Sequence, residues 1–342
     1  MQTDTFGRIA GAIAIVLGVA AVFMLNGAAQ AQSPAAPRYP WDHRPTKCFA
    51  EDAPALGDCK LENSPTFGLT TRRLAILYFN RQFELLEHAL AEIATPERRF
   101  ASGESGDLAI YEAFRHMLPG GGVDQGEWEG RIARWRAAAP ESRYTHFAEA
   151  RFLYSYAWNG RGSGYAASVS KESWDLFNIR LQEAEQLLFK APQHLKDSPL
   201  WHNLLLAIAS DTRSVRSDPE EVFEQAVKRW PSYYNFYGVR LSRLLPQWGG
   251  SWEAIEAFIR KWSRAQEASE GRSLYARLYA AVLSMGYTPD QTRYDWNLMK
   301  ESLAELVTRF PDPWYRNLYA SFACVARDDA AFRKAISAIP RH

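Results

Sequence analysis

One corner between two helices decides the fold of this chain, and it reads Leu245-Pro246-Gln247-Trp248-Gly249-Gly250-Ser251-Trp252. Pro246 ends the preceding helix, because it lacks an amide donor and crowds the carbonyl four residues back. Gly249 and Gly250 permit the positive φ that a rapid change of direction requires. Ser251 can cap the next helix, whose apolar residues recur at helical spacing: Trp252, Ile255, Phe258, Ile259 and Trp262. The corner therefore predicts a helical hairpin.

The two indoles of this corner have two interpretations, which the sequence leaves open. Trp248 and Trp252 pack in a core, as aromatic residues at helical spacing usually do, or they line a rigid groove for a ligand.

The order of elements at the corner recurs along the chain. A helix end, a proline, a short gap and an aromatic-rich helix follow one another at Pro140, Pro192, Pro231 and Pro311. Their spacing indicates a unit of about 40 residues with two helices, which is typical of an α-solenoid and longer than the tetratricopeptide unit. No alternating strand pattern occurs. We expect an all-α fold over residues 67–342, an α-solenoid of stacked, tetratricopeptide-like helical hairpins.

The N-terminus predicts export. Arg8 precedes an uninterrupted apolar run from Ile9 to Leu25, and Ala29-Gln30-Ala31 has the small-x-small pattern of a signal-peptidase site. Residues 1–31 are therefore expected to be a signal peptide that is cut between Ala31 and Gln32. The mature protein would be periplasmic or secreted, with no stable membrane anchor after cleavage.

Export changes the interpretation of the three cysteines. Cys48 and Cys59 lie in the proline-rich leader of residues 32–66, and an exported loop of this kind is expected to form a disulfide. Cys324 lies in an apolar helical stretch and is expected to be a buried, unbridged thiol. No histidine pair accompanies the cysteines at zinc-ligand spacing, so we expect no metal.

Composition and motifs exclude several classes of protein. The chain has 40 basic and 39 acidic residues in 342, a balance that does not favour nucleic acid as a partner. It lacks G-x-S-x-G and H-E-x-x-H, so no catalytic constellation, and with it no cofactor, is expected. The loop Arg161-Gly162-Ser163-Gly164-Tyr165 could form a backbone nest for an anion, or it could simply be a flexible connection between helices.

Three stretches also resemble a known family: Tyr237 with the corner 244–251, Arg161-Gly162-x-Gly164-Tyr165, and Trp314 with Phe322-Ala323-Cys324-x-Ala326-x-Asp328. Together they look like the bacterial domain-of-unknown-function family 4034, over roughly residues 70–335. The resemblance implies a tetratricopeptide-like fold and carries no established activity.

The leading hypothesis is an exported helical-repeat scaffold, with no chemistry of its own, that binds a peptide, protein or envelope polymer. Repeat stacks present extended concave surfaces, and the candidate contacts are Trp248, Trp252, Tyr234, Tyr237, Arg161 and Tyr165. The alternatives are an unrecognised cell-envelope hydrolase, which two acids with shifted pKa values would favour, and an immunity or partner-masking protein.

Overall fold

The computed structural model describes residues 67–94, 99–118, 124–162, 164, 166–310 and 312–339. Across these residues the chain is all-α, and the one β interaction is an isolated bridge between Arg99 and Ser105. The all-α class expected from the sequence is therefore confirmed. No helix among the described residues is both long and apolar enough to span a membrane.

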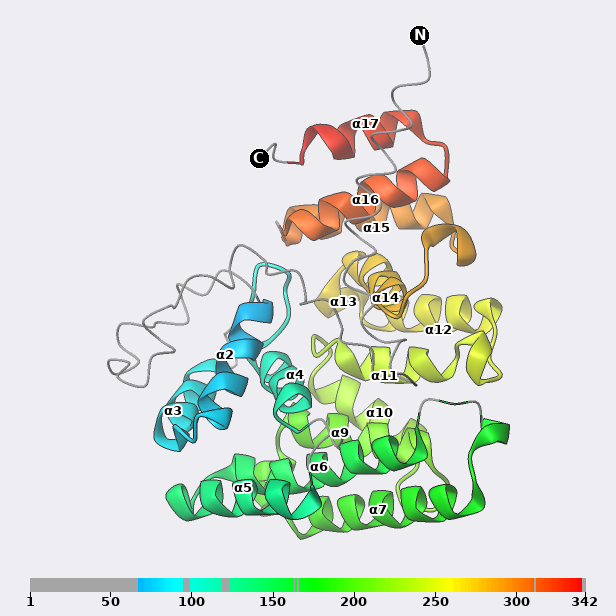
Figure 1. The fold of residues 1–342 in the computed structure, drawn as a ribbon. Helices are drawn as coiled ribbons and strands as arrows, with labels where there is room; N and C mark the ends of the chain where they lie inside the picture. Colours follow the sequence, from blue (N-terminus) through cyan, green and yellow to red (C-terminus); the bar gives the residue numbers. More distant parts are fainter. Residues whose placement is uncertain are drawn as a thin grey trace, which may run out of the picture. The chain divides into compact units, whose positions relative to one another are not determined.

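The helices form two compact units, which divide between Arg240 and Leu241. The N-terminal unit contains α2 (Phe67–Phe79), α3 (Phe83–Ile93), α4 (Gly106–Met117), α5 (Gln125–Ala138), α6 (Arg143–Arg161), η6 (Ala166–Ser168), α7 (Lys171–Lys190), α8 (Gln193–Lys196), α9 (Pro199–Asp211) and α10 (Pro219–Arg229). Helix α11 (Asn235–Arg243) crosses the division. The C-terminal unit continues with η7 (Pro246–Trp248), α12 (Trp252–Ala265), α13 (Glu267–Glu270), α14 (Ser273–Ser284), η8 (Pro289–Gln291), α15 (Trp296–Arg309), α16 (Pro313–Val325) and α17 (Asp329–Ser337). Figure 1 labels the helices.

Local chemistry explains where the helices begin. Serine or aspartate caps most of them: the Ser142 hydroxyl accepts from Tyr144 N at 3.1 Å, and the Asp218 carboxylate accepts from Glu220 N and Glu221 N at 2.9 Å each. Proline opens α9, α10 and α16, because the first helical position needs no amide donor. Of the recurring prolines, Pro140, Pro192 and Pro231 lie between helices, as the sequence predicts, and Pro311 lies outside the described residues.

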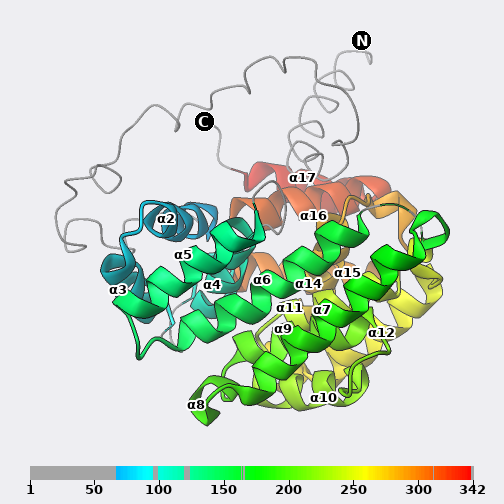
Figure 2. The ribbon, with the colours of Figure 1, turned by 60° about the horizontal axis from the view of Figure 1, so that its bottom comes forward.

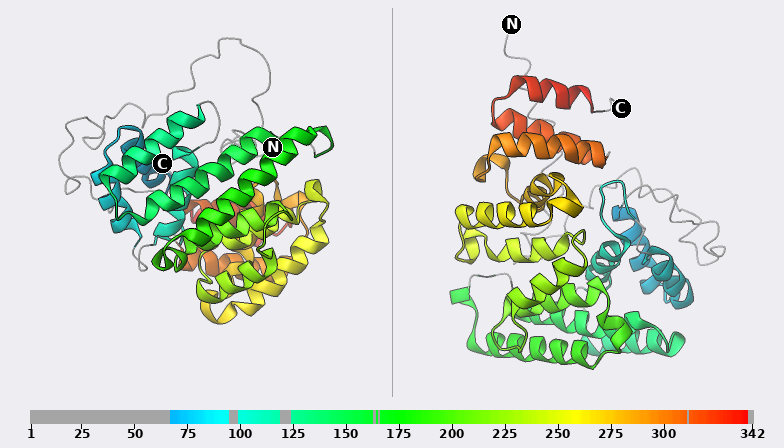
Figure 3. Two further views of the ribbon diagram at one scale, coloured as in Figure 1. Left: turned by 90° about the horizontal axis from the view of Figure 1, so that it is seen from below. Right: turned by 180° about the vertical axis from the view of Figure 1, so that it is seen from behind.

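Packing within each unit is mainly between helices that are neighbours in the sequence. In the N-terminal unit α5, α6 and α7 lie side by side (Figure 2), and α7 packs in turn on α9 and α9 on α10. In the C-terminal unit α14, α15, α16 and α17 pack in succession (Figure 3). This nearest-neighbour pattern is typical of repeat proteins.

Helix α4 departs from this pattern. It packs on α2, α6 and α9, and α9 begins more than eighty positions after α4 ends. Helix α4 therefore brings polar side chains from distant parts of the sequence together inside the N-terminal unit.

Candidate functional site

The corner Leu245–Trp252 has the geometry of a rigid turn. Gly249 has φ +88°, a left-handed conformation that side chains rarely adopt. Gly250 is required for a different reason: a Cβ there would lie 2.0 Å from the carbonyl oxygen of Leu244. The Ser251 hydroxyl caps α12 by accepting from Ala254 N at 3.1 Å. Pro246 opens the short helix η7, so all four predicted turn residues act in the turn.

The two indoles of the corner lie at the surface. Trp248 is 43% exposed, and the Arg243 guanidinium lies 5.4 Å from its ring centroid. Trp252 is half-buried and meets Tyr287 edge to face at 5.0 Å between ring centroids. The Tyr287 hydroxyl in turn donates to Gln247 Oε1 at 3.4 Å. These five residues form a surface cluster that we call the corner patch: Arg243, Gln247, Trp248, Trp252 and Tyr287.

The glycine-rich loop after α6 is held by Arg161 itself. The Arg161 side chain is buried, and its guanidinium lies 5.1 Å from the Trp158 ring centroid and 4.7 Å from that of Trp174. Its Nη1 donates to the carbonyls of Gly162 at 2.9 Å and Gly164 at 3.1 Å. The arginine therefore binds the loop backbone between two indoles. Tyr165, the other candidate of this loop, lies outside the described residues.

Tyr234 and Tyr237 belong to the interior of the N-terminal unit. Tyr237 is fully buried, packs edge to face on Phe223 at 5.6 Å, and donates its hydroxyl to the Pro231 carbonyl at 3.2 Å. Tyr234 is buried as well. A fully buried ring cannot contact a partner at the surface, so Tyr237 serves the core in this structure.

The cysteine predictions have different outcomes. Cys324 is unbridged, but it is exposed on α16, so its predicted burial is wrong. The core face of that helix is formed by Tyr315, Leu318, Tyr319 and Phe322, and Cys324 points away from it. Cys48 and Cys59 lie outside the described residues.

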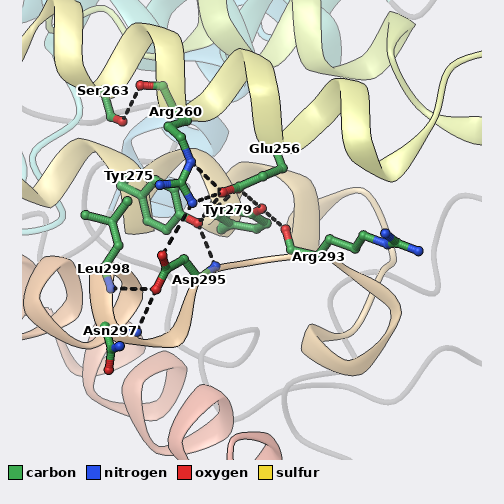
Figure 4. Close-up of polar contacts among 9 residues, drawn as sticks. All are labelled: Glu256, Arg260, Ser263, Tyr275, Tyr279, Arg293, Asp295, Asn297 and Leu298. Carbon is green, nitrogen blue, oxygen red and sulfur yellow. Dashed lines mark hydrogen bonds and ion pairs between the residues drawn. The ribbon is translucent and has the colours of Figure 1, made fainter.

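Sequence reasoning missed a polar cluster in the C-terminal unit, centred on Glu256 of α12 (Figure 4). Its carboxylate accepts from Arg260 Nη2 at 2.6 Å and from the Tyr275 hydroxyl at 2.9 Å. The Tyr279 hydroxyl lies within hydrogen-bond reach of both this carboxylate and the Arg293 carbonyl. Because a hydroxyl has one proton, it donates to one of these acceptors at a time. Burial raises the pKa of both tyrosines, so both remain protonated donors at neutral pH.

This Glu256 cluster joins three helices. Tyr275 comes from α14, and its hydroxyl accepts from the amide of Asp295 at 3.1 Å. Asp295 caps α15 through Asn297 N and Leu298 N, at 3.0 and 3.2 Å. The cluster therefore links α12, α14 and the start of α15 through hydrogen bonds.

A second missed cluster surrounds Tyr111 on α4 in the N-terminal unit. The Arg151 guanidinium, from α6, lies 5.7 Å from the Tyr111 ring centroid and 5.0 Å from that of Tyr154. The Tyr154 hydroxyl donates to Asp211 Oδ2 at 2.9 Å, and Trp158 Nε1 donates to the same oxygen at 2.7 Å. We call these residues the α4 cluster; cations, acids and aromatic rings meet there within one unit.

Two acids of the N-terminal unit have raised pKa values. Burial raises the pKa of Asp107, in the first turn of α4, to about 6, against the opposing charges of Arg143 and Arg99. Burial also raises the pKa of Glu87 on α3. Glu87 Oε1 accepts from Trp135 Nε1 at 2.7 Å and from the Ser142 hydroxyl at 2.6 Å, which ties α3 to the turn between α5 and α6. These contacts assign Glu87 a structural role.

The described residues contain no group of three or more histidine, cysteine, aspartate or glutamate side chains placed to hold a metal ion. Comparison with protein-family models, with curated proteins and with solved structures finds no match to this chain.

Proposed function

We propose that this chain is an exported helical-repeat scaffold that binds a peptide, protein or envelope polymer through the corner patch. The observation that carries the proposal is the exposure of Trp248, 43% of whose surface remains accessible on a turn of fixed geometry. Exposed tryptophan on a rigid element is a poor contribution to stability but a good contact for a partner.

The composition of the corner patch supports binding. Tryptophan, tyrosine and arginine are the residues most enriched at interaction hot spots, since they offer a large contact area and a polar group together. Arg243 beside the Trp248 ring adds a charge and Gln247 beside Tyr287 adds an amide. The turn presents these groups without ordering a loop, which lowers the entropy lost on binding.

Three further features belong to the same proposal. The signal-peptide pattern of residues 1–31 favours a location outside the cytoplasm, where envelope polymers and exported proteins are found. The nearest-neighbour helix packing of each unit supports a solenoid-type repeat. The resemblance to domain-of-unknown-function family 4034 implies the same type of repeat fold and adds no activity.

The test compares Trp248→Ala with Trp314→Ala in the mature protein. Trp314 lies on α16 and is 39% exposed, so the two substitutions remove similarly accessible indoles. We expect Trp248→Ala to change the Tm by no more than about 2 °C, because an exposed side chain contributes less than about 1 kcal/mol. It should abolish capture of a partner from an envelope extract, while Trp314→Ala leaves capture intact.

Two results would count against the proposal. Capture that survives Trp248→Ala would remove the corner patch from binding. A large fall in Tm, of the size expected for loss of a core indole at about 3–5 kcal/mol, would instead assign Trp248 to packing.

A further inference from the structure

We propose that the N-terminal unit holds a binding site for a monoanionic carboxylate at Arg151, between Tyr111 and Tyr154. The site lies on α4 and α6, and it stands apart from the corner patch, so either proposal can fail alone. The ligand class is a carboxylate of an organic acid or of a peptide C-terminus.

The state of Arg151 is the first argument. Arg151 is 5% exposed. Among the described residues its guanidinium makes one hydrogen bond, which Nη1 donates to the Ser155 hydroxyl at 2.6 Å. Nε has no hydrogen-bond partner, and no described acid pairs with this guanidinium. A buried cation is costly unless an anion accepts its hydrogen bonds. A carboxylate would supply that anion with the bidentate geometry that guanidinium groups prefer.

A second unpartnered polar group lies near α4. Tyr233 is buried, its hydroxyl has no hydrogen-bond partner among the described residues, and its pKa is raised by burial and then by Tyr111, Asp107 and Glu112, all on α4. Burial raises the pKa of Tyr111 and of Tyr233, so both hydroxyls remain protonated at neutral pH. A buried hydroxyl without a partner is unusual in a folded protein and points to an acceptor that binds there.

The charges around the site favour a ligand with one negative charge over a ligand with two. The Glu112 carboxylate pairs with Arg115 at 2.8 Å, and the Asp211 carboxylate is held by neutral donors from Tyr154 and Trp158. These two acids would repel a dianion such as sulfate more strongly than a carboxylate. The Glu112 and Arg115 side chains remain 24% and 41% exposed, so the cluster reaches solvent at this end of α4.

The experiment measures the Tm of the full mature protein in sodium acetate, sodium sulfate and sodium chloride at equal ionic strength. A ligand that binds the native state raises the Tm. We expect acetate to raise the Tm over chloride by about 2 °C or more beyond the shift that Arg151→Gln shows. Sulfate stabilises folded proteins generally by its exclusion from their surface, so its shift should be similar in the two proteins. The same Tm measurement with N-acetylalanine and with its amide distinguishes an organic acid from a peptide C-terminus as the ligand. A larger shift with the acid than with acetate indicates a peptide C-terminus, whereas equal shifts indicate an organic acid.

Matched variants locate the effect. For Arg151→Gln, the Tm in acetate is compared with the Tm of the same variant in chloride. The part of the acetate shift that comes from binding at the site should be lost. Arg180→Gln should retain it, since Arg180 also lies over a tyrosine, at 3.3 Å from the Tyr156 centroid, but on α7. Tyr233→Phe should raise the Tm in chloride, because it removes an unpartnered buried hydroxyl, and should reduce the acetate shift.

Three outcomes would overturn the site. They are an acetate shift absent from the wild-type protein, an acetate shift that Arg151→Gln retains in full, and a sulfate shift that Arg151→Gln reduces as much as the acetate shift. Because each variant is compared with itself in chloride, a general loss of stability cannot imitate any of them.

Discussion

Gly249 and Gly250 of the corner are neighbours with different reasons to be glycine. Gly249 has open space around its Cα but a φ of +88°. Gly250 has an ordinary φ, yet a Cβ there would lie 2.0 Å from the Leu244 carbonyl oxygen and 2.3 Å from its carbon. A side chain at Gly249 therefore strains one residue, whereas a side chain at Gly250 must displace the backbone of Leu244, the residue after α11.

This difference is measurable by urea unfolding. Gly249→Ala should cost about 1 kcal/mol, and Gly249→Asn less, since asparagine tolerates the left-handed region. Gly250→Ala should cost about 2–3 kcal/mol, as for an overpacked backbone contact. Equal losses at the two positions would contradict this account of the turn.

Among the helices, α12 combines a buried apolar face, with Ile255 and Ile259, and one carboxylate that joins it to α14. Glu256 accepts hydrogen bonds from Arg260 and Tyr275 and shares the Tyr279 hydroxyl with the Arg293 carbonyl. Removing it takes away the side-chain acceptor of the buried Tyr275 hydroxyl and the closest acid of Arg260. We expect Glu256→Ala to lower the free energy of unfolding by about 2–4 kcal/mol. Glu253→Ala is the matched control on the same helix. Both side chains of its ion pair with Arg293 are exposed, so the pair should contribute less than about 1 kcal/mol to stability. Thermal unfolding that ranks the two variants equally would show that the Glu256 cluster does not hold α12.

The boundaries of the helices could be predicted from sequence, whereas the clusters between them could not. Pro140, Ser142 and Asp218 act on their own or adjacent helices, so their effect is visible in a short stretch of sequence. Glu256 meets Tyr275 and Tyr279 across 19 and 23 positions, and Trp158 meets Asp211 across 53. No local spacing encodes such contacts, because they depend on how helices pack. Cys324 shows the same limit, since an apolar stretch of sequence does not specify which side of α16 faces the core.

At the scale of the whole molecule, the cleavage of the N-terminus and the state of the three cysteines can be measured together. Cleavage between Ala31 and Gln32 should give a mature chain that begins at Gln32, which intact mass spectrometry of the exported protein would measure. Alkylation of that native protein without reductant should add one group, at the exposed Cys324, and reduction in denaturant should reveal Cys48 and Cys59 as well. Three adducts before reduction would exclude the bridge, and an intact Met1 would exclude cleavage.

The contacts of α4 also determine when during synthesis this helix can pack. Arg99, just before α4, donates to the Ser232 hydroxyl at 2.6 Å, and these residues are 133 positions apart. At roughly 5–20 residues per second, the ribosome needs on the order of 10 s to make the chain between them. For most of that time, until Asp211 has been made, Tyr111 and the rest of α4 lack the helix α9 that packs on them. The nascent chain is therefore most open to chaperones, and to aggregation, while the second third of the protein is being translated.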